Sequence, residues 1–351
     1  MESIYYVLCW ACHRRCKHCY EDRFHPYTGA ALEAVVREAE ENAPRIIANL
    51  PPSMLYRDLD AVDAAGAPAV RRGRIILAGG DVLVDPVRER VLYPTLARLR
   101  ARYAAAGGVR LVVQTTGDLV TPAIVEALLH HGADHLSISG LDDFHVGMQG
   151  EKKDALKADL TALFDRLGLV PGGAAGGDSG RPSYSFFGAT PDQWIGKIWP
   201  RGRAWDNGLS TATLADNFCN RWSGALGFLR HGFAGSEVAV DPSGAVYPCC
   251  LKTAAPLGSL LEEPLTAILD SLAGHPAFEA LSGGRPERMG LALGWSVDAF
   301  LAASETTTPD GRPYRNLCVG CDRFHERVLG PVIDALREER RRARHGVQPA
   351  A

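Results

Sequence analysis

The cysteines of this chain are grouped in a way that indicates metal chemistry. The 351 residues contain nine cysteines, arranged as four within eleven residues, one alone, one adjacent pair and one CxxC pair. In chain order these are Cys9, Cys12, Cys16, Cys19, Cys219, Cys249, Cys250, Cys318 and Cys321. Clustered cysteines in a reducing compartment more often bind metal or take part in catalysis than form disulfides. An odd number would also leave one thiol over from a complete disulfide set.

Cys12, Cys16 and Cys19 have the spacing CxxxCxxC on one short loop. Thiolate is the usual ligand of iron–sulfur clusters, so three of them can hold three irons of a cubane [4Fe–4S] cluster. A set of three leaves the fourth iron open, just as catalytic metal sites keep one position for substrate. The alternatives are incidental clustering and zinc, although zinc sites favour CxxC or CxxH pairs that complete a tetrahedron. Cys9 precedes the loop and is interpreted as a buried apolar side chain.

The segments around this loop alternate between strand and helix patterns. Short apolar runs that end in glycine or a small polar residue predict buried parallel strands. These runs are 3–8, 74–80, 109–117, 134–140, 182–190 and 197–208. Helical patterns occupy 30–50, which Pro44 is expected to break or kink, 91–108 and 121–133. Ligands bind at the carboxyl ends of parallel strands, so residues 79–81, 114–117 and 137–140 are expected to converge on one site.

The strand and helix rhythm stops near residue 215. The segment EVAVDPSGAVYPCC predicts a hairpin with its turn at 241–244, and 263–273 predicts an amphipathic helix. The stretch 275–316 has no clear assignment, and the Gly-rich run 171–180 is expected to be a flexible crossing. A terminal helix over 328–344 leads into REERRRARH, a charge run that we expect to face solvent.

The motifs together resemble those of the radical S-adenosylmethionine (radical SAM) enzymes. That family carries CxxxCxΦC, where Φ is aromatic, and His18 takes the Φ position here. Residues 79–81 (GGD) resemble the family's GGE, with Asp81 in place of Glu. Residues 114–117 (QTTG), 137–140 (SISG) and 200–204 (PRGRA) resemble its third and fourth strand ends and its PxGRA element. The resemblance covers roughly residues 3–210.

This resemblance implies a cofactor and a radical reaction. It implies a partial (β/α)6 TIM-like barrel over residues 1–214, with a [4Fe–4S] cluster on Cys12, Cys16 and Cys19 whose open iron chelates S-adenosylmethionine. One electron, from a flavodoxin- or ferredoxin-type donor, cleaves the sulfonium to a 5′-deoxyadenosyl radical that abstracts a substrate hydrogen. The residues implied to contact the cofactor are His18, Gly79, Gly80, Asp81, Thr115, Ser139 and Arg203.

The C-terminal cysteines resemble those of a second cluster domain. The stretch around Cys249 resembles the SPASM extension of radical SAM enzymes, or its shorter twitch form, which implies a small α+β domain over 215–351. The resemblance implies one auxiliary [4Fe–4S] cluster on Cys219, Cys249, Cys318 and Cys321, with Cys250 as an alternative for Cys249 or Cys219. The alternative is a zinc ribbon of Cys249, Cys250, Cys318 and Cys321. His325 could add a zinc ligand, but it is interpreted as a surface histidine.

The sequence leaves the substrate open. The candidate catalytic side chains are Asp142, His145 and Lys197, and Asp143, Trp194, Trp199 and Trp205 lie close to them in the chain. The resemblance implies oxidation, epimerisation or bond formation on a small biosynthetic intermediate or a ribosomal peptide. Because the cluster loop begins twelve residues from the start, we expect no leader-binding domain before it. The alternative class is a non-catalytic iron–sulfur electron carrier or a zinc-stabilised binding protein.

The composition argues against two classes of partner. The 38 Lys and Arg against 41 Asp and Glu give a formal charge of −3, with too little positive charge to neutralise a run of phosphates. No stretch reaches the ~18 apolar residues of a membrane span, and the N-terminal MESIYYVLCW has no cationic signal region. We therefore expect a cytoplasmic protein without nucleic-acid or membrane partners.

Overall fold

The sheet at the centre of the molecule is built mainly from parallel strands. The computed structural model describes residues 1–173, 180–188, 196–221, 223–344 and 346. Within these ranges one nine-stranded sheet has the order β11-β10-β9-β1-β4-β5-β6-β8-β7, parallel from β9 to β7 and antiparallel at β10 and β11. Its strands are β1 (Ser3–Val7), β4 (Arg74–Ala78), β5 (Arg110–Thr115), β6 (His135–Ile138), β7 (Val170–Pro171), β8 (Ser183–Phe186), β9 (Glu237–Val240), β10 (Ala245–Tyr247) and β11 (Gly258–Ser259).

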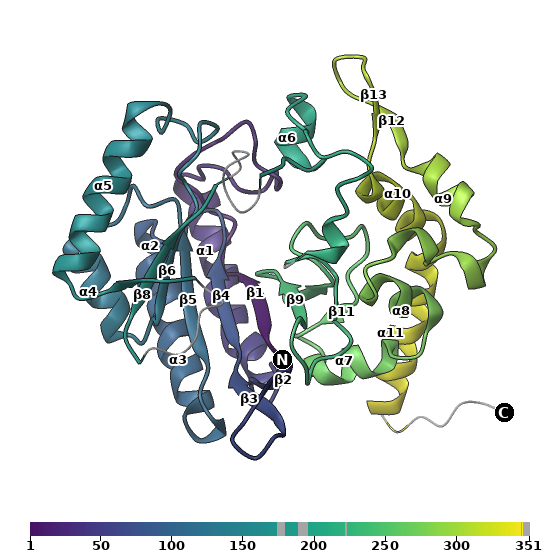
Figure 1. The fold of residues 1–351 in the computed structure, drawn as a ribbon, viewed down its shortest axis with the longest axis horizontal. Helices are drawn as coiled ribbons and strands as arrows, with labels where there is room; N and C mark the ends of the chain where they lie inside the picture. Colours follow the sequence, from purple (N-terminus) through teal and green to yellow (C-terminus); the bar gives the residue numbers. More distant parts are fainter. Residues whose placement is uncertain (174–179, 189–195, 222, 345, 347–351) are drawn as a thin grey trace.

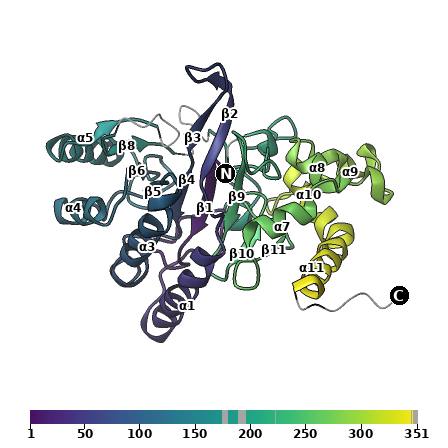
Figure 2. The same cartoon turned by 90° about the horizontal axis from the view of Figure 1, so that it is seen from below.

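Helices cover the sheet and form a second group beside it. Figures 1 and 2 show α1, α3, α4 and α5 along the parallel strands, and α7 to α11 gathered beyond β9 and β11. The helices are α1 (Gly29–Ala48), α2 (Asp85–Val87), α3 (Tyr93–Tyr103), α4 (Pro122–His130), α5 (Glu151–Arg166), α6 (Gly202–Asp206), α7 (Leu265–Leu272), α8 (Pro276–Ser282), α9 (Val297–Ala303), α10 (Leu317–Phe324) and α11 (Gly330–Arg344). Two small hairpins, β2 (Leu55–Val62) with β3 (Pro68–Arg72) and β12 (Glu305–Thr307) with β13 (Pro313–Arg315), stand apart from the main sheet.

The first five predicted strands are confirmed, and their burial explains their composition. Every residue of β1, β4 and β6 is buried. A parallel strand that is covered on both faces is mainly apolar along its length. The predicted helix over 30–50 is also present, but α1 runs through Pro44 to Ala48. Proline there removes one backbone hydrogen bond, while the next turn still buries Ile46 and Ile47 in the core.

The predicted sixth strand over 197–208 is wrong. Those residues form an irregular segment and the short helix α6, which begins at Gly202. The backbone of Gly202 has φ +49°, a left-handed conformation that ends the extended run. The β1 edge of the parallel sheet is instead extended by β9, which pairs with β1 from more than 200 residues further along the chain.

The predicted hairpin at 237–250 is confirmed as β9 and β10, whose residues pair antiparallel. Asp241 begins its turn and accepts hydrogen bonds from the backbone N–H groups of Ser243 and Ala245. The chain after residue 215 therefore contributes strands to the sheet of the first part. The amphipathic helix predicted over 263–273 is α7, and the stretch 275–316 contains α8, α9 and the β12–β13 hairpin. Most of the Gly-rich run 171–180 lies outside the described residues.

One surface prediction for the C-terminal region is wrong, and another holds except at one residue. His325 is fully buried, because it lies at the end of α10 on the face that packs inward. Arg340, inside the predicted solvent-facing charge run, is also buried. Its guanidinium donates to both carboxylate oxygens of Glu263, at 2.8 and 3.0 Å, and so joins α11 to the segment before α7. In the described part of the chain we find no helix that is long and apolar enough to span a membrane.

The ion pair of Arg340 and Glu263 should contribute strongly to stability. Arg340→Met would leave Glu263 buried with Arg344 as its remaining cation, so the free energy of unfolding should fall by about 3 kcal/mol. The matched control is Arg341→Met, whose half-exposed side chain pairs at the surface and should cost less than about 1 kcal/mol. Urea unfolding of the three proteins measures this difference. Equal losses for the two variants would contradict the role of the buried pair.

Candidate active site

The predicted cysteine loop follows β1 and faces a cavity at the carboxyl ends of the parallel strands. Cys12, Cys16 and Cys19 all line this cavity of about 230 Å³. Burial, followed by the nearby Asp81 and the other two thiols, raises the pKa of Cys12 to about 12. Neutral thiols are therefore the stable form of this pocket without a cation, and a bound metal cluster would favour the thiolates. Cys9 is buried beneath the loop, as predicted.

Glycine at two positions lets other segments approach this loop. A Cβ on Gly80 would lie 2.2 Å from the carbonyl oxygen of Ala11 and 2.7 Å from Cβ of Cys12. A Cβ on Gly202 would lie 2.7 Å from the backbone of Tyr20. The glycines of the GGD and PRGRA motifs therefore allow close packing against the backbone of the cysteine loop.

Arg203 holds the cysteine loop through its backbone. Its guanidinium donates hydrogen bonds to the carbonyl oxygens of Cys16 (3.1 Å), Asp22 (2.9 Å) and Phe24 (2.6 Å). Arg203 also lines the cavity, where the sequence predicted a contact with the cofactor. The geometry shows a positioning residue for the loop.

The Asp81 carboxylate faces into the protein. It accepts hydrogen bonds from the hydroxyl groups of Thr115 (2.9 Å) and Thr116 (2.7 Å) and from the backbone N–H of Leu83 (3.0 Å). Asp81 and Thr115 are both buried, and neither is among the residues that line the cavity, so the contact of their side chains with a cofactor stays a prediction. The shorter side chain of aspartate suits this inward network, which ties the end of β4 to the end of β5.

The strand ends nevertheless contribute polar groups to the cavity, as the sequence predicted. Gly79, Gly80, Gln114 and Ser139 line it, and Thr116 lines it in place of Thr115. The residues 79–81, 114–117 and 137–140 thus do converge at one edge of the sheet.

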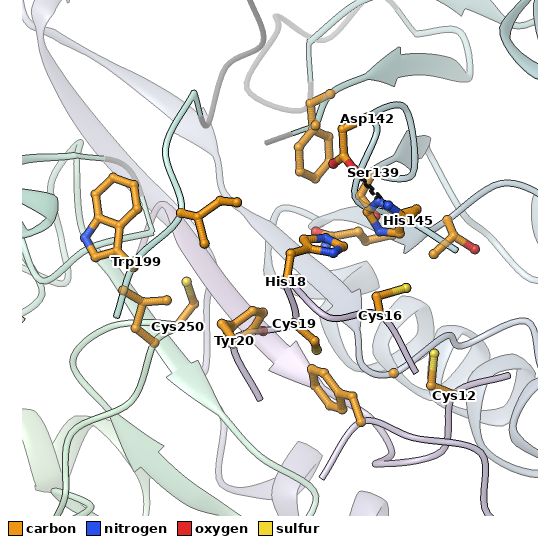
Figure 3. A pocket seen from close by; sticks show the side chains of 18 of the residues that line it. Cys12, Cys16, His18, Cys19, Tyr20, Ser139, Asp142, His145, Trp199 and Cys250 are labelled. Atoms are coloured by element: carbon orange, nitrogen blue, oxygen red, sulfur yellow. Dashed lines mark hydrogen bonds and ion pairs between the residues drawn. The ribbon is translucent and has the colours of Figure 1, made fainter. Parts of the chain in front are cut away.

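His18, Asp142 and His145 form a compact group on the wall of the cavity (Figure 3). Nδ1 of His145 lies 2.9 Å from the Asp142 carboxylate, and the two imidazole rings are 4.5 Å apart between centroids. Because Asp142 accepts from Nδ1, Nε2 of His145 carries the lone pair. Burial, followed by His145, lowers the pKa of His18 to about 4, so this neighbouring ring is neutral at pH 7.

The opposite wall comes from segments after residue 196. Lys197, Trp199, Cys250 and Leu251 line the cavity there, and Figure 3 shows Trp199, Cys250 and Tyr20 together on that side. The Nζ of Lys197 lies 3.8 Å from Asp216. Asp143 pairs with Lys153 and Trp205 packs on Tyr314, so neither lines the cavity, and Trp194 lies outside the described residues.

Four C-terminal cysteines form a second group behind this wall. Burial and the neighbouring thiols of Cys219, Cys249 and Cys318 raise the pKa of Cys321 well above its usual range. Burial, then Cys318 and Cys249, do the same for Cys219. The structure therefore brings Cys219, Cys249, Cys318 and Cys321 together, while Cys250 opens on the cavity.

Single zinc ions and iron–sulfur clusters differ in how far apart they hold their thiol ligands. A Zn–S bond of about 2.3 Å in a tetrahedron places sulfurs about 3.8 Å apart. In the part of the chain that the structure describes, the groups whose ligand atoms all lie within 4.8 Å of one another are His18–Asp142–His145 and His13–Asp81–Asp118, and neither includes a cysteine. A cubane [4Fe–4S] core, which is larger than one zinc ion, would hold its thiolates further apart.

Arg201 contacts the second cysteine group, and the sequence reasoning did not select it as a site residue. Its guanidinium lies 2.7 Å from the Asp322 carboxylate and donates to the carbonyl oxygen of Cys318 at 3.3 Å. Burial raises the pKa of Cys318 to about 12, and the Arg201 charge opposes that rise. The sequence signal that could have pointed to Arg201 was its position between Pro200 and Gly202 in the PRGRA motif.

Comparisons with known proteins give a distant likeness. No protein-family model matches this chain, and no curated protein is similar to it in sequence. Among solved structures, the chain is similar to radical SAM enzymes with AdoMet (S-adenosylmethionine) bound. For anSMEcpe with bound AdoMet the identity is 10% and the TM-score 0.43, over 96% of this chain and 100% of that one. For BtrN in complex with AdoMet and 2-DOIA the identity is 13% and the TM-score 0.41, over 81% of this chain and 88% of that one. For Streptococcus suis SuiB bound to precursor peptide SuiA the identity is 10% and the TM-score 0.39, over 80% of this chain and 66% of that one. Because these identities and TM-scores are low, the roles of the site residues rest on the contacts within this chain.

The close approach of Gly80 to the cysteine loop can be tested by loading the protein with iron and sulfide. Gly80→Ala should displace Cys12 and reduce the iron bound from about eight to about four atoms per chain, if each cysteine group holds one cubane cluster. The matched control is Gly172→Ala, because a Cβ there would meet only Ser183 at an ordinary 3.6 Å. Full iron content in Gly80→Ala would show that this contact does not position Cys12.

Proposed function

We propose that this protein is a radical SAM enzyme with two iron–sulfur clusters. Cys12, Cys16 and Cys19 would hold a [4Fe–4S] cluster that binds S-adenosylmethionine. Cys219, Cys249, Cys318 and Cys321 would hold one auxiliary [4Fe–4S] cluster. The observation that carries the proposal is the three-cysteine group, whose thiols open on a cavity instead of completing a closed site. With S-adenosylmethionine bound, such a cluster supplies the electron that yields a hydrogen-abstracting radical.

The residues of this chain have separable roles in the proposed site. Arg203 and the two motif glycines position the cysteine loop, as their contacts indicate. Gly79, Thr116 and Ser139 are the strand-end groups available to contact S-adenosylmethionine, because they line the cavity next to the loop. Phe187, Ile198, Trp199, Phe218 and Leu251 add an apolar lining that helps to exclude water from the reacting groups.

The proposed reaction is oxidation of a substrate that carries an exchangeable proton. His145 is the proposed base, since it lines the cavity and its Nδ1 bonds to Asp142, which leaves Nε2 as the acceptor. His145 would take the proton of the substrate O–H or N–H, and a cluster held by Cys219, Cys249, Cys318 and Cys321 would supply an acceptor for one electron. With the abstraction of one hydrogen atom from C–H, these losses would leave a double bond. The cavity suits a small biosynthetic intermediate or one side chain of a peptide.

Cleavage of S-adenosylmethionine tests the proposed function without knowledge of the substrate. The anaerobically reconstituted, dithionite-reduced protein should release methionine and 5′-deoxyadenosine, and Cys16→Ala should abolish the release because the cluster loses a ligand. A reconstituted protein that binds iron but releases neither product would indicate an electron carrier. Zinc in place of iron would indicate a zinc-stabilised binding protein.

The assignment of His145 as a substrate base gives a distinct prediction. His145→Ala should keep the release of 5′-deoxyadenosine within about twofold of the wild type in the absence of substrate, since a base acts after S-adenosylmethionine is cleaved. Cys250→Ala is a control from the opposite wall of the same cavity. Loss of cleavage in His145→Ala would place the residue in the cofactor site instead.

A further inference from the structure

His325 is buried at the end of α10, the helix that carries Cys318 and Cys321. Its side chain is fully buried, and neither ring nitrogen has a hydrogen-bond partner among the described residues. A polar group that is taken out of water without a partner costs roughly 1–3 kcal/mol. Such a residue implies that a group absent from the polypeptide satisfies the ring.

The helix directs His325 to the same side as two cysteines. Cys318, Cys321 and His325 are three and four residues apart, so they lie on one face of α10 and its continuation. A π-helical turn, His325–Leu329, begins at this residue, and such turns occur frequently at functional sites.

Arg201 connects the ring to the thiols. The Arg201 guanidinium bonds to the Cys318 carbonyl, and it acts electrostatically on Cys318, Cys321, Cys249 and His325. One cation therefore faces both the four-cysteine group and the buried imidazole.

We infer that His325 donates its ring N–H to a sulfur of the auxiliary cluster and thereby raises the reduction potential of that cluster. This inference rests on the proposed function, which places a [4Fe–4S] cluster on the four cysteines. Four thiolates complete the ligand set, so the imidazole is left to act from outside it. Hydrogen bonds to the sulfurs and nearby positive charge raise cluster potentials. The auxiliary site is then suited to accept one electron rather than to deliver one.

The potential can be measured on the full-length chain with only the auxiliary cluster present. The triple variant Cys12→Ala, Cys16→Ala, Cys19→Ala carries only the auxiliary cluster. This cluster is reduced stepwise with dithionite in the presence of redox mediators, and EPR measures the fraction that is reduced at each potential. His325→Phe keeps an aromatic ring but removes the N–H donor. At a fixed solution potential it should lower the ratio of reduced to oxidised cluster at least tenfold, which corresponds to a fall of about 59 mV in the reduction potential of the cluster. His325→Gln keeps an N–H donor and should recover most of the shift.

Controls separate this inference from the proposed function. His231→Phe removes a half-buried histidine that pairs with Asp270 at the surface, and it should leave the potential unchanged. An unchanged potential in His325→Phe, with full iron content, overturns the inference alone. If His325→Phe does not bind iron at the auxiliary site, pulsed EPR of the protein that retains His325 tests the inference instead. A weak nitrogen coupling is expected, and either a directly coordinated nitrogen or none overturns the inference. Zinc at the four cysteines overturns the inference together with the proposed auxiliary cluster.

Discussion

The cysteine loop can present three thiols to one cavity only if its irregular backbone is held from outside. A loop between β1 and α1 has carbonyl groups that no regular element satisfies, and a buried carbonyl without a donor is costly. Arg203 meets this need with one rigid guanidinium that reaches the carbonyls of Cys16, Asp22 and Phe24. The backbone N–H of Ala204 adds a bond to the carbonyl of Cys19. The positions of the thiols therefore depend on a segment more than 180 residues away in the sequence.

The pairing of β1 with β9 places the two cysteine groups near one another. β9 lies beside β1 and runs in the same direction, and Cys249 and Cys250 follow β10, which pairs with β9 and runs back along it. An ion pair between Lys252 and Glu21 connects the two loops, and the Lys252 ammonium lies 4.4 Å from the centre of the Trp10 ring. Because Lys252 is buried, the attraction is less weakened by solvent than that of a surface pair. The two cysteine groups are thus fixed relative to each other by a strand pair and a buried ion pair.

The sequence predicts what local periodicity and spacing encode, and it fails where distant residues decide. Five parallel strands, the hairpin at 237–250 and the cysteine groups follow from patterns within short windows. The PRGRA segment was expected to be a strand, because its packing against Tyr20 and the carbonyl partners of Arg203 cannot be read from its own residues. The same holds for Asp81, whose carboxylate is taken up by threonines of the next strand. His325 was expected at the surface, since no local pattern shows which segments cover it.

The adjacent cysteines show how one short segment serves two sites. Burial and the charges of Arg201 and Asp322 act on Cys249, whereas Cys250 is half-buried near Tyr5 and Tyr20 and lines the cavity. The backbone bends at this dipeptide, where the Lys252 N–H donates to the Cys249 carbonyl, so the two neighbouring side chains can belong to different groups. Trp199 occupies the same boundary, since it lines the cavity and packs in one apolar cluster with Cys318. A substitution at this boundary that displaces side chains of the cavity must therefore also displace side chains of the second cysteine group. One layer of side chains thus couples the two sites.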